Sequence, residues 1–320
     1  MARNSPANSA LAGVASRARI LDSCRASLSS PSLLPGRLSR DPLRAPFLKW
    51  AGGKQWLAPL LANALPECSG TYFEPFLGAG ALFFAYEPPR AVLADSNRWL
   101  METFTAVSNM PEAIMRHLHR WPYNKKVYYD IRSRRFRASP ARAAQMIYLN
   151  RTCWNGLFRV NQRGEFNVPF GRFKNPTICN EDRIIAASKA LRGKQLLCAD
   201  FEETVASARR GDMVYLDPPY TVKHENNGFL RYNEQIFSWH DQTRLAEAAN
   251  ALVAKGCRVI VSNAWDRALL KLYRGFFALR VSRRTNLAAD TMLRSSAHEA
   301  IFSSFDLDLP LMPGSRRGRL

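Results

Sequence analysis

The residues Asp217-Pro218-Pro219-Tyr220 directly follow the hydrophobic run of residues 213–216. That run predicts a buried strand, and the strand ends at the prolines because neither has an N–H group to donate to a ladder. Asp217 and Tyr220 are therefore presented at a strand end, where open α/β sheets bind their ligands. Taken alone, the pattern is also typical of a strand followed by a stiff turn without a function. Other motifs in the sequence are needed to distinguish a ligand site from such a turn.

Such a strand end has the groups needed to activate an exocyclic amine of a base. The amine is a poor nucleophile because its lone pair is delocalised into the ring. The carboxylate of Asp217 and the backbone carbonyl of Pro218 can each accept one of its N–H bonds, which aims the lone pair at an electrophilic methyl group. The prolines make the turn rigid, and a misplacement of ~1 Å can cost ~100-fold in rate. Tyr220 can stack on a base that has left the duplex.

A glycine turn and a second strand-end acid indicate a cofactor site. Phe76 opens the turn FLGAG, whose glycines are Gly78 and Gly80, between a strand pattern and a helix pattern. Such a turn lets a ligand approach the backbone at a helix N-terminus. A dinucleotide-binding fingerprint needs a third glycine at position 83, where this chain has Phe. Asp95 ends the next short strand and can hold both hydroxyls of a ribose. Together these features favour S-adenosylmethionine over NAD.

The charge of the chain predicts a polyanionic partner. Its 46 Lys and Arg residues against 26 Asp and Glu residues give a net charge of +20. Nucleic acid is the commonest such partner, and acidic lipid is the second interpretation. A membrane-spanning segment is not expected, because no apolar run approaches the ~18–20 residues required. Residues 101–180 carry a net charge of +10, so we expect a nucleic-acid-binding domain to be inserted there.

The cysteines predict no metal site. The six cysteines are scattered, without a C-x-x-C pair or a nearby histidine that would complete a zinc site. They suit a reducing cytoplasm, and we expect a cytoplasmic protein of bacterial origin, or a phage-encoded one acting in the host cytoplasm.

Strand and helix patterns alternate on both sides of the basic segment, which favours an α/β fold with a doubly wound, mostly parallel sheet. The first 45 residues differ, since they hold seven arginines and two acids without periodicity. A disordered arm, an organellar transit peptide and a misassigned start all fit that composition. We expect a disordered basic extension at 1–45, a catalytic domain in two pieces at 46–98 and 181–310, a target-recognition domain at 99–180 and a basic tail at 311–320.

Five motifs in order resemble the Dam-type (D12 class) DNA adenine-N6 methyltransferases. They are FLKWAGGK, YFEPFLGAGALFF, LADSN, YLNRTCWNGLFRVNQRGEFNVPFGRFKNP and YLDPPY, within residues 46–305. The resemblance implies a Rossmann-like class I methyltransferase sheet with an inserted, mainly helical DNA-recognition domain. It also implies transfer of a methyl group from S-adenosylmethionine to N6 of adenine in duplex DNA, within GATC, after the base is flipped into the DPPY pocket.

The resemblance assigns roles to the residues of these motifs. Asp95 is expected to hold the ribose and the pair Asp200-Phe201 to lie beside the cofactor's adenine. The expected catalytic residues are Asp217, Pro218, Pro219 and Tyr220. The expected cofactor-binding residues are Trp50, Lys54, Phe76, Gly78, Gly80, Asp95, Asp200, Phe201 and Asp217.

A third set of residues is expected to bind DNA. Arg159 and Pro169 match positions that recognise bases in GATC, and Lys49 matches one that reaches the outer guanine. An arginine suits this because it donates twice to guanine, although each arginine here also fits a phosphate contact or a surface charge. Trp154 stands where the family often has Tyr. The full set is Lys49, Arg151, Trp154, Asn155, Leu157, Arg159, Arg163 and Pro169, of which Leu157 contacts a base or wedges near it and Asn155, Arg151 and Arg163 contact phosphates.

Three other functions fit the sequence less well. Methylation of RNA or of a protein glutamine uses a related Asn-Pro-Pro-Tyr, whereas position 217 is Asp. Cytosine-C5 methylation needs a nucleophilic cysteine, usually after a proline, and no cysteine of this chain follows one. A DNA-binding protein without activity would not need both Asp217 and Tyr220. The expected partners are double-stranded DNA and a cognate restriction endonuclease that acts in trans. Neither a metal nor a membrane is expected.

Overall fold

The structure is a computed structural model of the 320-residue chain, and it describes residues 42–137, 139–221, 237–283, 297–307, 309 and 316–319. All of these belong to one compact unit, residues 40–320. Most of the expected N-terminal extension lies outside the described residues, as do residues 222–236. Residues 42–44 form the 3-10 helix η1 (Pro42–Arg44), and residues 316–319 of the expected tail form a strand.

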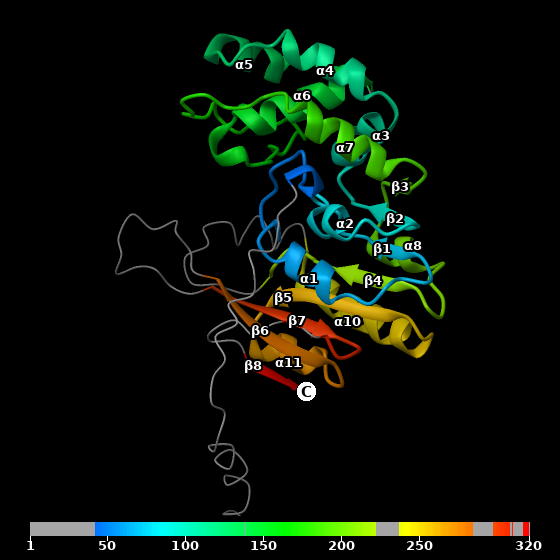
Figure 1. Cartoon of the computed structure of the whole chain (residues 1–320). Coiled ribbons are helices and arrows are strands. Elements are labelled where there is room, and N and C mark those ends of the chain that lie inside the picture. The colour runs from blue at the N-terminus through cyan, green and yellow to red at the C-terminus, as the bar shows by residue number, and fades with distance from the viewer. Residues whose placement is uncertain are drawn as a thin grey trace, which may run out of the picture. The chain divides into compact units, whose positions relative to one another are not determined.

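The described strands form one mixed sheet of eight strands, in the order β3-β2-β1-β4-β5-β7-β6-β8. The first five are parallel and the last three are antiparallel. Figure 1 shows the labelled strands side by side in this order. The bounds are β1 Tyr72–Glu74, β2 Ala91–Ala94, β3 Gln195–Leu197, β4 Met213–Leu216, β5 Arg258–Ala264, β6 Phe277–Arg283, β7 Ala297–Ser303 and β8 Arg316–Arg319. The predicted α/β fold is confirmed, with an antiparallel edge added to its parallel half.

Each strand of the parallel half sends alternate side chains into two separate cores. In β4, Met213 and Tyr215 join one hydrophobic cluster, while Val214 and Leu216 join the other. This follows from the period of two along a strand. All four side chains are buried, so the hydrophobic run identified in the sequence is a strand covered on both faces.

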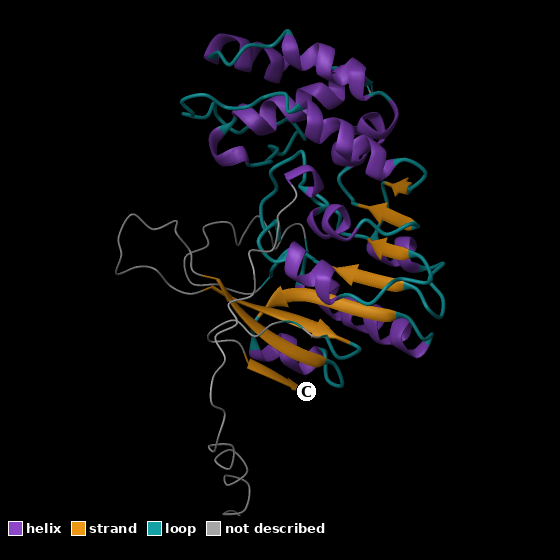
Figure 2. Ribbon diagram, viewed as in Figure 1, coloured by secondary structure: helices purple, strands orange, loops and turns teal. Residues whose placement is uncertain are grey.

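Helices cover both faces of the sheet (Figures 1 and 2). One face carries α1 (Ala58–Ala64) and α2 (Ala81–Tyr86). The other carries α8 (Phe201–Val205), α10 (Trp239–Ala254) and α11 (Arg267–Leu272). Among the described helices, none is both long and apolar enough to cross a membrane.

The segment between β2 and β3 is mainly helical. Helix α6, of which most residues are buried, packs against its neighbours α3, α4 and α5, beyond the β3 end of the sheet in Figure 1. A loop follows it, in which Cys153 bridges Phe170 and Val160 bridges Phe166. The bounds are α3 Arg98–Asn109, α4 Pro111–His119, α5 Lys125–Ser133, α6 Pro140–Thr152, the 3-10 helix η2 Trp154–Gly156 and α7 Glu181–Leu191.

Candidate active site

The two strongest sequence motifs lie at the ends of neighbouring parallel strands. β1 pairs with β4 in the register Tyr72↔Met213 and Phe73↔Val214. The chain proceeds from β1 to β2 and β3 on one side and from β4 to β5 on the other. The strand order therefore reverses between β1 and β4, and in open α/β sheets the crevice at such a switch point binds the ligand. The glycine turn after β1 and Asp217 after β4 share that crevice edge.

The glycine turn needs its glycines. Gly78 and Gly80 have φ angles of +48° and +72°, a region that side-chain-bearing residues rarely adopt. A Cβ at Gly78 would also lie 2.9 Å from Cδ1 of Trp50. Trp50 thus packs directly on the turn, which places the first and second motifs together.

Asp95 supports the same turn. Its Oδ2 accepts a hydrogen bond from the backbone N–H of Gly78 at 3.0 Å, and its Oδ1 accepts one from Asn97 at 2.9 Å. Desolvation raises the pKa of Asp95, and the two backbone N–H groups oppose that rise. The sequence predicts a ribose-binding carboxylate at this position, and the structure adds its contact with the backbone of Gly78.

A buried ammonium group stands at the end of β4. Lys54 is only 4% exposed, and its Nζ lies 3.1 Å from Oδ1 of Asp217 and 3.9 Å from Oε2 of Glu299. The same Nζ donates to the carbonyl of Gly52 at 3.2 Å and lies 4.7 Å from the ring centroid of Tyr220. Lys54 therefore joins the first motif to the strand-end acid and its tyrosine.

The charges of this cluster depend on one another. Burial lowers the pKa of Lys54, but Asp217, Tyr220 and Glu299 together raise it well above its usual value. Burial raises the pKa of Asp217, and the ammonium of Lys54 is the largest influence that lowers it again. A carboxylate in low dielectric keeps its charge only with such a partner. The ammonium group of Lys54 therefore favours the ionised form of Asp217.

Two buried amide side chains support the proline turn through hydrogen bonds. The Nε2 of Gln242 donates to the carbonyl of Pro219 at 3.4 Å, and Nδ2 of Asn263 donates to Oε1 of Gln242 at 3.0 Å. Both amide side chains are fully buried. Since a buried amide is costly to leave unpaired, this relay fixes the backbone next to Asp217 from helix α10 and strand β5.

An aromatic cluster flanks the glycine turn on the α8 side. The rings of Phe76 and Phe201 stack with centroids 5.5 Å apart, and Phe237 meets Phe76 edge-on at 5.6 Å. Asp200 caps α8, because its Oδ1 accepts from the N–H of Glu202 at 3.0 Å. The expected pair Asp200-Phe201 is therefore next to the glycine turn.

Lys49 lies against the loop of the basic segment. Its backbone N–H donates to Oδ1 of Asn150 at 2.8 Å, and Nδ2 of Asn150 donates back to the carbonyl of Lys49 at 2.8 Å. Desolvation, with the nearby charge of Arg151, lowers the pKa of Lys49, and its Nζ lies 4.6 Å from the ring centroid of Phe173. Trp50, the next residue, stacks on Phe158 at 5.2 Å. The strand-end site and the basic loop are thus in direct contact.

The other expected DNA-binding residues lie along this loop. Trp154 is 49% exposed, and its backbone N–H donates to the carbonyl of Pro169 at 2.9 Å. The guanidinium of Arg159 donates to Oδ1 of Asn167 at 2.7 Å. Asn155 adopts a left-handed φ of +54°. The exposed members are Trp154, Asn155, Arg159, Arg163 and Pro169, and the partly buried ones are Arg151 and Leu157.

Four residues in and around this site are not predicted from the sequence. Glu299, Gln242 and Asn263 reach the site from β7, α10 and β5, and no local pattern marks them. The fourth, Glu74, is buried in β1 and accepts a 2.7 Å hydrogen bond from Tyr72. Desolvation raises the pKa of Glu74 to about 8. Its position in a fully buried strand was the available signal. Among the described residues, no group of His, Cys, Asp and Glu side chains is arranged to hold a metal ion.

Comparison with known proteins places the chain among DNA methyltransferases. The sequence model of the D12 class N6 adenine-specific DNA methyltransferases matches residues 50–287. The chain is 36% identical over 270 residues to the Type II methyltransferase M1.LlaDCHI of Lactococcus lactis subsp. cremoris, covering 81% of this chain and 95% of that protein. It is 37% identical over 236 residues to the DNA adenine methylase of Vibrio cholerae, covering 72% and 84% of the two chains. The DNA adenine methylase of Serratia marcescens is 34% identical over 262 residues, with 80% and 96% covered.

Proposed function

Because the chain belongs to the D12 class of N6 adenine-specific DNA methyltransferases, we propose that it methylates the adenine of GATC in duplex DNA, with S-adenosylmethionine as the donor. The activity on adenine in DNA follows from the family. What we propose beyond the family is the methyl donor, the target sequence and the presence of a pocket for the flipped base. The observation that carries it is the carboxyl group of Asp217 at the switch point of the sheet, with its Oδ1 3.1 Å from Nζ of Lys54.

The residues around the glycine turn fit S-adenosylmethionine. Glycine at position 78 leaves bare backbone in the turn, and Trp50 packs against it so closely that a Cβ there would lie 2.9 Å from its Cδ1. Asp95 supplies a carboxylate for the ribose hydroxyls, and Phe76, which stacks on the buried Phe201, supplies a flat surface for a base. When bound, the cofactor supplies a methyl group on a sulfonium. The proposed holding residues are Trp50, Lys54, Phe76, Gly78, Gly80, Asp95, Asp200, Phe201 and Asp217.

The DPPY turn would prepare the target amine. Asp217 and the carbonyl of Pro218 each accept one N–H of the N6 amino group, which directs the nitrogen lone pair away from both acceptors. The cofactor would supply the methyl carbon to this nitrogen and its sulfur would keep the electron pair of the broken carbon–sulfur bond, while the amino group would lose one proton to water. The buried amide of Gln242 holds Pro219 at 3.4 Å while this happens, and rigid placement of this kind contributes to the rate. Tyr220 would stack on the flipped adenine.

The segment 99–180 would recognise the target, between catalytic pieces at 46–98 and 181–310. Its net charge of +10 supports a DNA contact. Arg159 and Pro169 would recognise bases and Lys49 the outer guanine, with Leu157 beside a base and Trp154 as an exposed aromatic. Phosphate contacts would come from Arg151, Asn155 and Arg163.

An open pocket beside the loop supports the same placement. It has a volume of about 420 Å³, and Tyr123 and Phe173 are among its lining residues. Lys125 and Arg172 add positive charge to the lining, and none of the lining residues is acidic. Aromatic rings with neighbouring cations are typical of nucleic-acid contacts, and this pocket adjoins Pro169 through Phe170.

Methyl transfer to defined duplexes tests the proposed function. The protein is incubated with methyl-labelled S-adenosylmethionine and with duplexes that contain GATC or a permuted site, and the modified base is identified by nucleoside mass spectrometry. N6-methyladenine in the GATC duplex alone is expected. Asp217→Ala should abolish transfer and leave DNA binding in place. Equal labelling of both duplexes would refute the target sequence, and label on cytosine would refute the mechanism.

A restriction partner is a separate proposal. The relative from Lactococcus lactis bears the name Type II methyltransferase, which supports a cognate endonuclease acting in trans. Such an enzyme, supplied from a neighbouring gene, should cut unmethylated DNA and spare DNA that this protein has methylated. Cleavage of both DNAs would contradict the pairing.

A further inference from the structure

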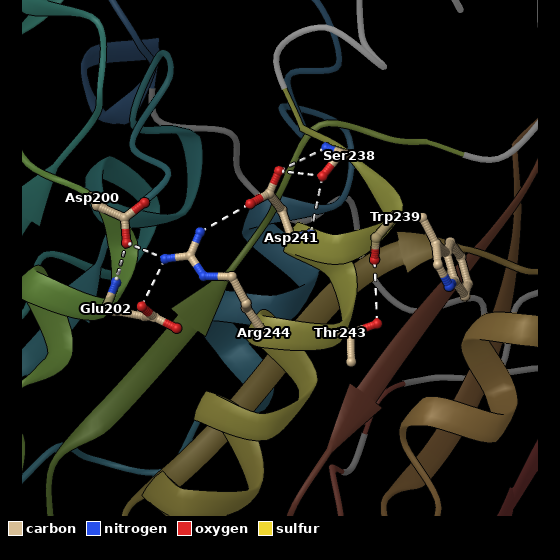
Figure 3. Close-up of polar contacts among 7 residues, drawn as sticks. All are labelled: Asp200, Glu202, Ser238, Trp239, Asp241, Thr243 and Arg244. Atoms are coloured by element: carbon tan, nitrogen blue, oxygen red, sulfur yellow. Dashed lines mark hydrogen bonds and ion pairs between the residues drawn. The ribbon is translucent and has the colours of Figure 1, made fainter.

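Helix α10 begins beside the loops that follow β3 and β4, since Arg244 contacts Asp200 and Gln242 contacts Pro219. Ser238 caps it, since its Oγ accepts from the N–H of Asp241 at 3.2 Å while Oδ2 of Asp241 accepts from the N–H of Ser238 at 2.8 Å. Such a capping box fixes the first turn of a helix. Figure 3 shows Arg244, one turn further on, reaching from α10 toward the start of α8.

The guanidinium of Arg244 joins three carboxylates. It lies 2.9 Å from Oδ1 of Asp241, 3.2 Å from Oδ1 of Asp200 and 2.7 Å from Oε2 of Glu202. Its Cζ also lies 4.9 Å from the ring centroid of Phe201. One side chain thus contacts both Asp200 and Phe201, the two residues beside the glycine turn, and ties them to the capped start of α10.

These contacts leave Asp200 oriented in one way. The N–H of Glu202 and the guanidinium of Arg244 both bind its Oδ1, as the dashed lines in Figure 3 show. The other oxygen, Oδ2, is therefore the atom that this arrangement presents to a ligand. Phe201 is held between the guanidinium and the ring of Phe76, which stacks on it at 5.5 Å.

We propose that Arg244 is a positioning residue for the adenine of the cofactor. It orients Asp200 so that Oδ2 accepts a hydrogen bond from the adenine amino group, and it holds the buried Phe201 ring on which Phe76 stacks beside the base pocket. This inference rests on the proposed function, because it assumes S-adenosylmethionine in the pocket. Only an arginine can bind several carboxylates and lie against a ring at the same time, since a lysine offers a point charge without a planar face.

A stabilising role alone would have a different signature. The Arg244 side chain is 29% exposed, and ion pairs at such positions contribute little to stability. If Arg244 acts only on the fold, its loss should affect every ligand equally. If it orients Asp200, its loss should affect ligands that carry the adenine amino group and spare those that lack it.

Calorimetric binding of two product analogues separates these roles. The ligands are S-adenosylhomocysteine and S-inosylhomocysteine, in which a carbonyl oxygen replaces the amino group of the base. For Arg244→Met we expect the dissociation constant of the adenine ligand to rise about tenfold, as for loss of a charge-assisted contact, with a much smaller rise for the inosine ligand. The KM for S-adenosylmethionine should rise likewise, with kcat within about threefold of wild type.

Thr243→Ala is the matched control, because Thr243 bonds Trp239 on another side of the same helix turn (Figure 3). It should bind both ligands as the wild type does. Arg244→Lys carries the test if Arg244→Met does not fold, and it should show the same preference in a weaker form. Equal losses for both ligands, or no loss for either, would overturn the role of Arg244. A wild-type protein that binds neither ligand would overturn the proposed function and this inference with it.

Discussion

Replacing Lys54 with methionine tests how the site keeps Asp217 ionised. The change removes an ammonium that is 4% exposed and lies 3.1 Å from Asp217 and 3.9 Å from Glu299. Methionine fills similar space, so the main effect is electrostatic. Breaking a buried ion pair by removing one partner costs about 3–5 kcal/mol, and we expect Lys54→Met to lower the free energy of unfolding by that amount at pH 7.5.

The loss should shrink as the pH falls. Burial already raises the pKa of Asp217, and Lys54 is the largest influence that lowers it. Without Lys54 the folded variant holds a proton on Asp217 at a pH where the unfolded chain has released it. Unfolding then releases a proton, so the free energy of unfolding falls as pH rises, by at most about 1.4 kcal/mol per pH unit for one proton. Lowering the pH to 5.5 should restore part of the lost stability.

Urea unfolding at pH 5.5 and 7.5, followed by tryptophan fluorescence, measures both quantities. Lys271→Met is the control, since Lys271 is an exposed residue of the last turn of α11 and its loss should change the free energy of unfolding by no more than about 0.5 kcal/mol. Methyl transfer by Lys54→Met should be lost at both pH values. A destabilisation that is the same at pH 5.5 and 7.5 would refute the assignment of Lys54 as the group that keeps Asp217 charged.

Three further changes give distinct readouts. Arg159→Ala should flatten the preference among GATC variants by ~1–3 kcal/mol in competition assays, and unchanged discrimination would make Arg159 a phosphate contact. Gln242→Leu should lower kcat by about tenfold with little change in either KM, because a misplaced turn affects the reacting geometry; a normal kcat in steady-state assays would exclude the relay. The raised pKa of Glu74, about 8 against an ordinary 4.5, makes stability fall as pH rises between these values. Glu74→Gln should flatten that decrease in urea unfolding, and an unaltered pH profile would contradict it.

The local part of the site was predictable because its signals are contiguous. A hydrophobic run followed by Asp217 and two prolines identifies a strand end, and β4 ends at Leu216. The glycine turn and Asp95 follow from the same reasoning, and the structure places both at the same edge of the sheet. Residues that are adjacent in the chain remain close together once the strand has formed, so such a motif can be interpreted without knowledge of the tertiary structure.

The supporting residues were not predictable, because they come from elements whose pairing a single sequence does not reveal. Glu299 lies near Lys54 because its strand, β7, pairs antiparallel with β5. Gln242 is one of several polar residues in α10, and only the packing of that helix shows that it is fully buried against Pro219. Charge density alone located the basic segment, but its contact with the site through Lys49 and Asn150 depends on tertiary structure.

The three acceptors around Lys54 resolve a conflict in the chemistry proposed for Asp217. A buried carboxylate alone takes up a proton, so it needs a cation to remain an acceptor for the target amine. A cation engaged with that carboxylate alone would compete with the amine for its oxygens. Lys54 is instead shared, since the carbonyl of Gly52 at 3.2 Å and Glu299 at 3.9 Å bind the same ammonium that contacts Oδ1 of Asp217. Lys54 thus favours the charged form of Asp217 while its attraction is divided among three acceptors, so that it competes less with an amine that would donate to the carboxylate.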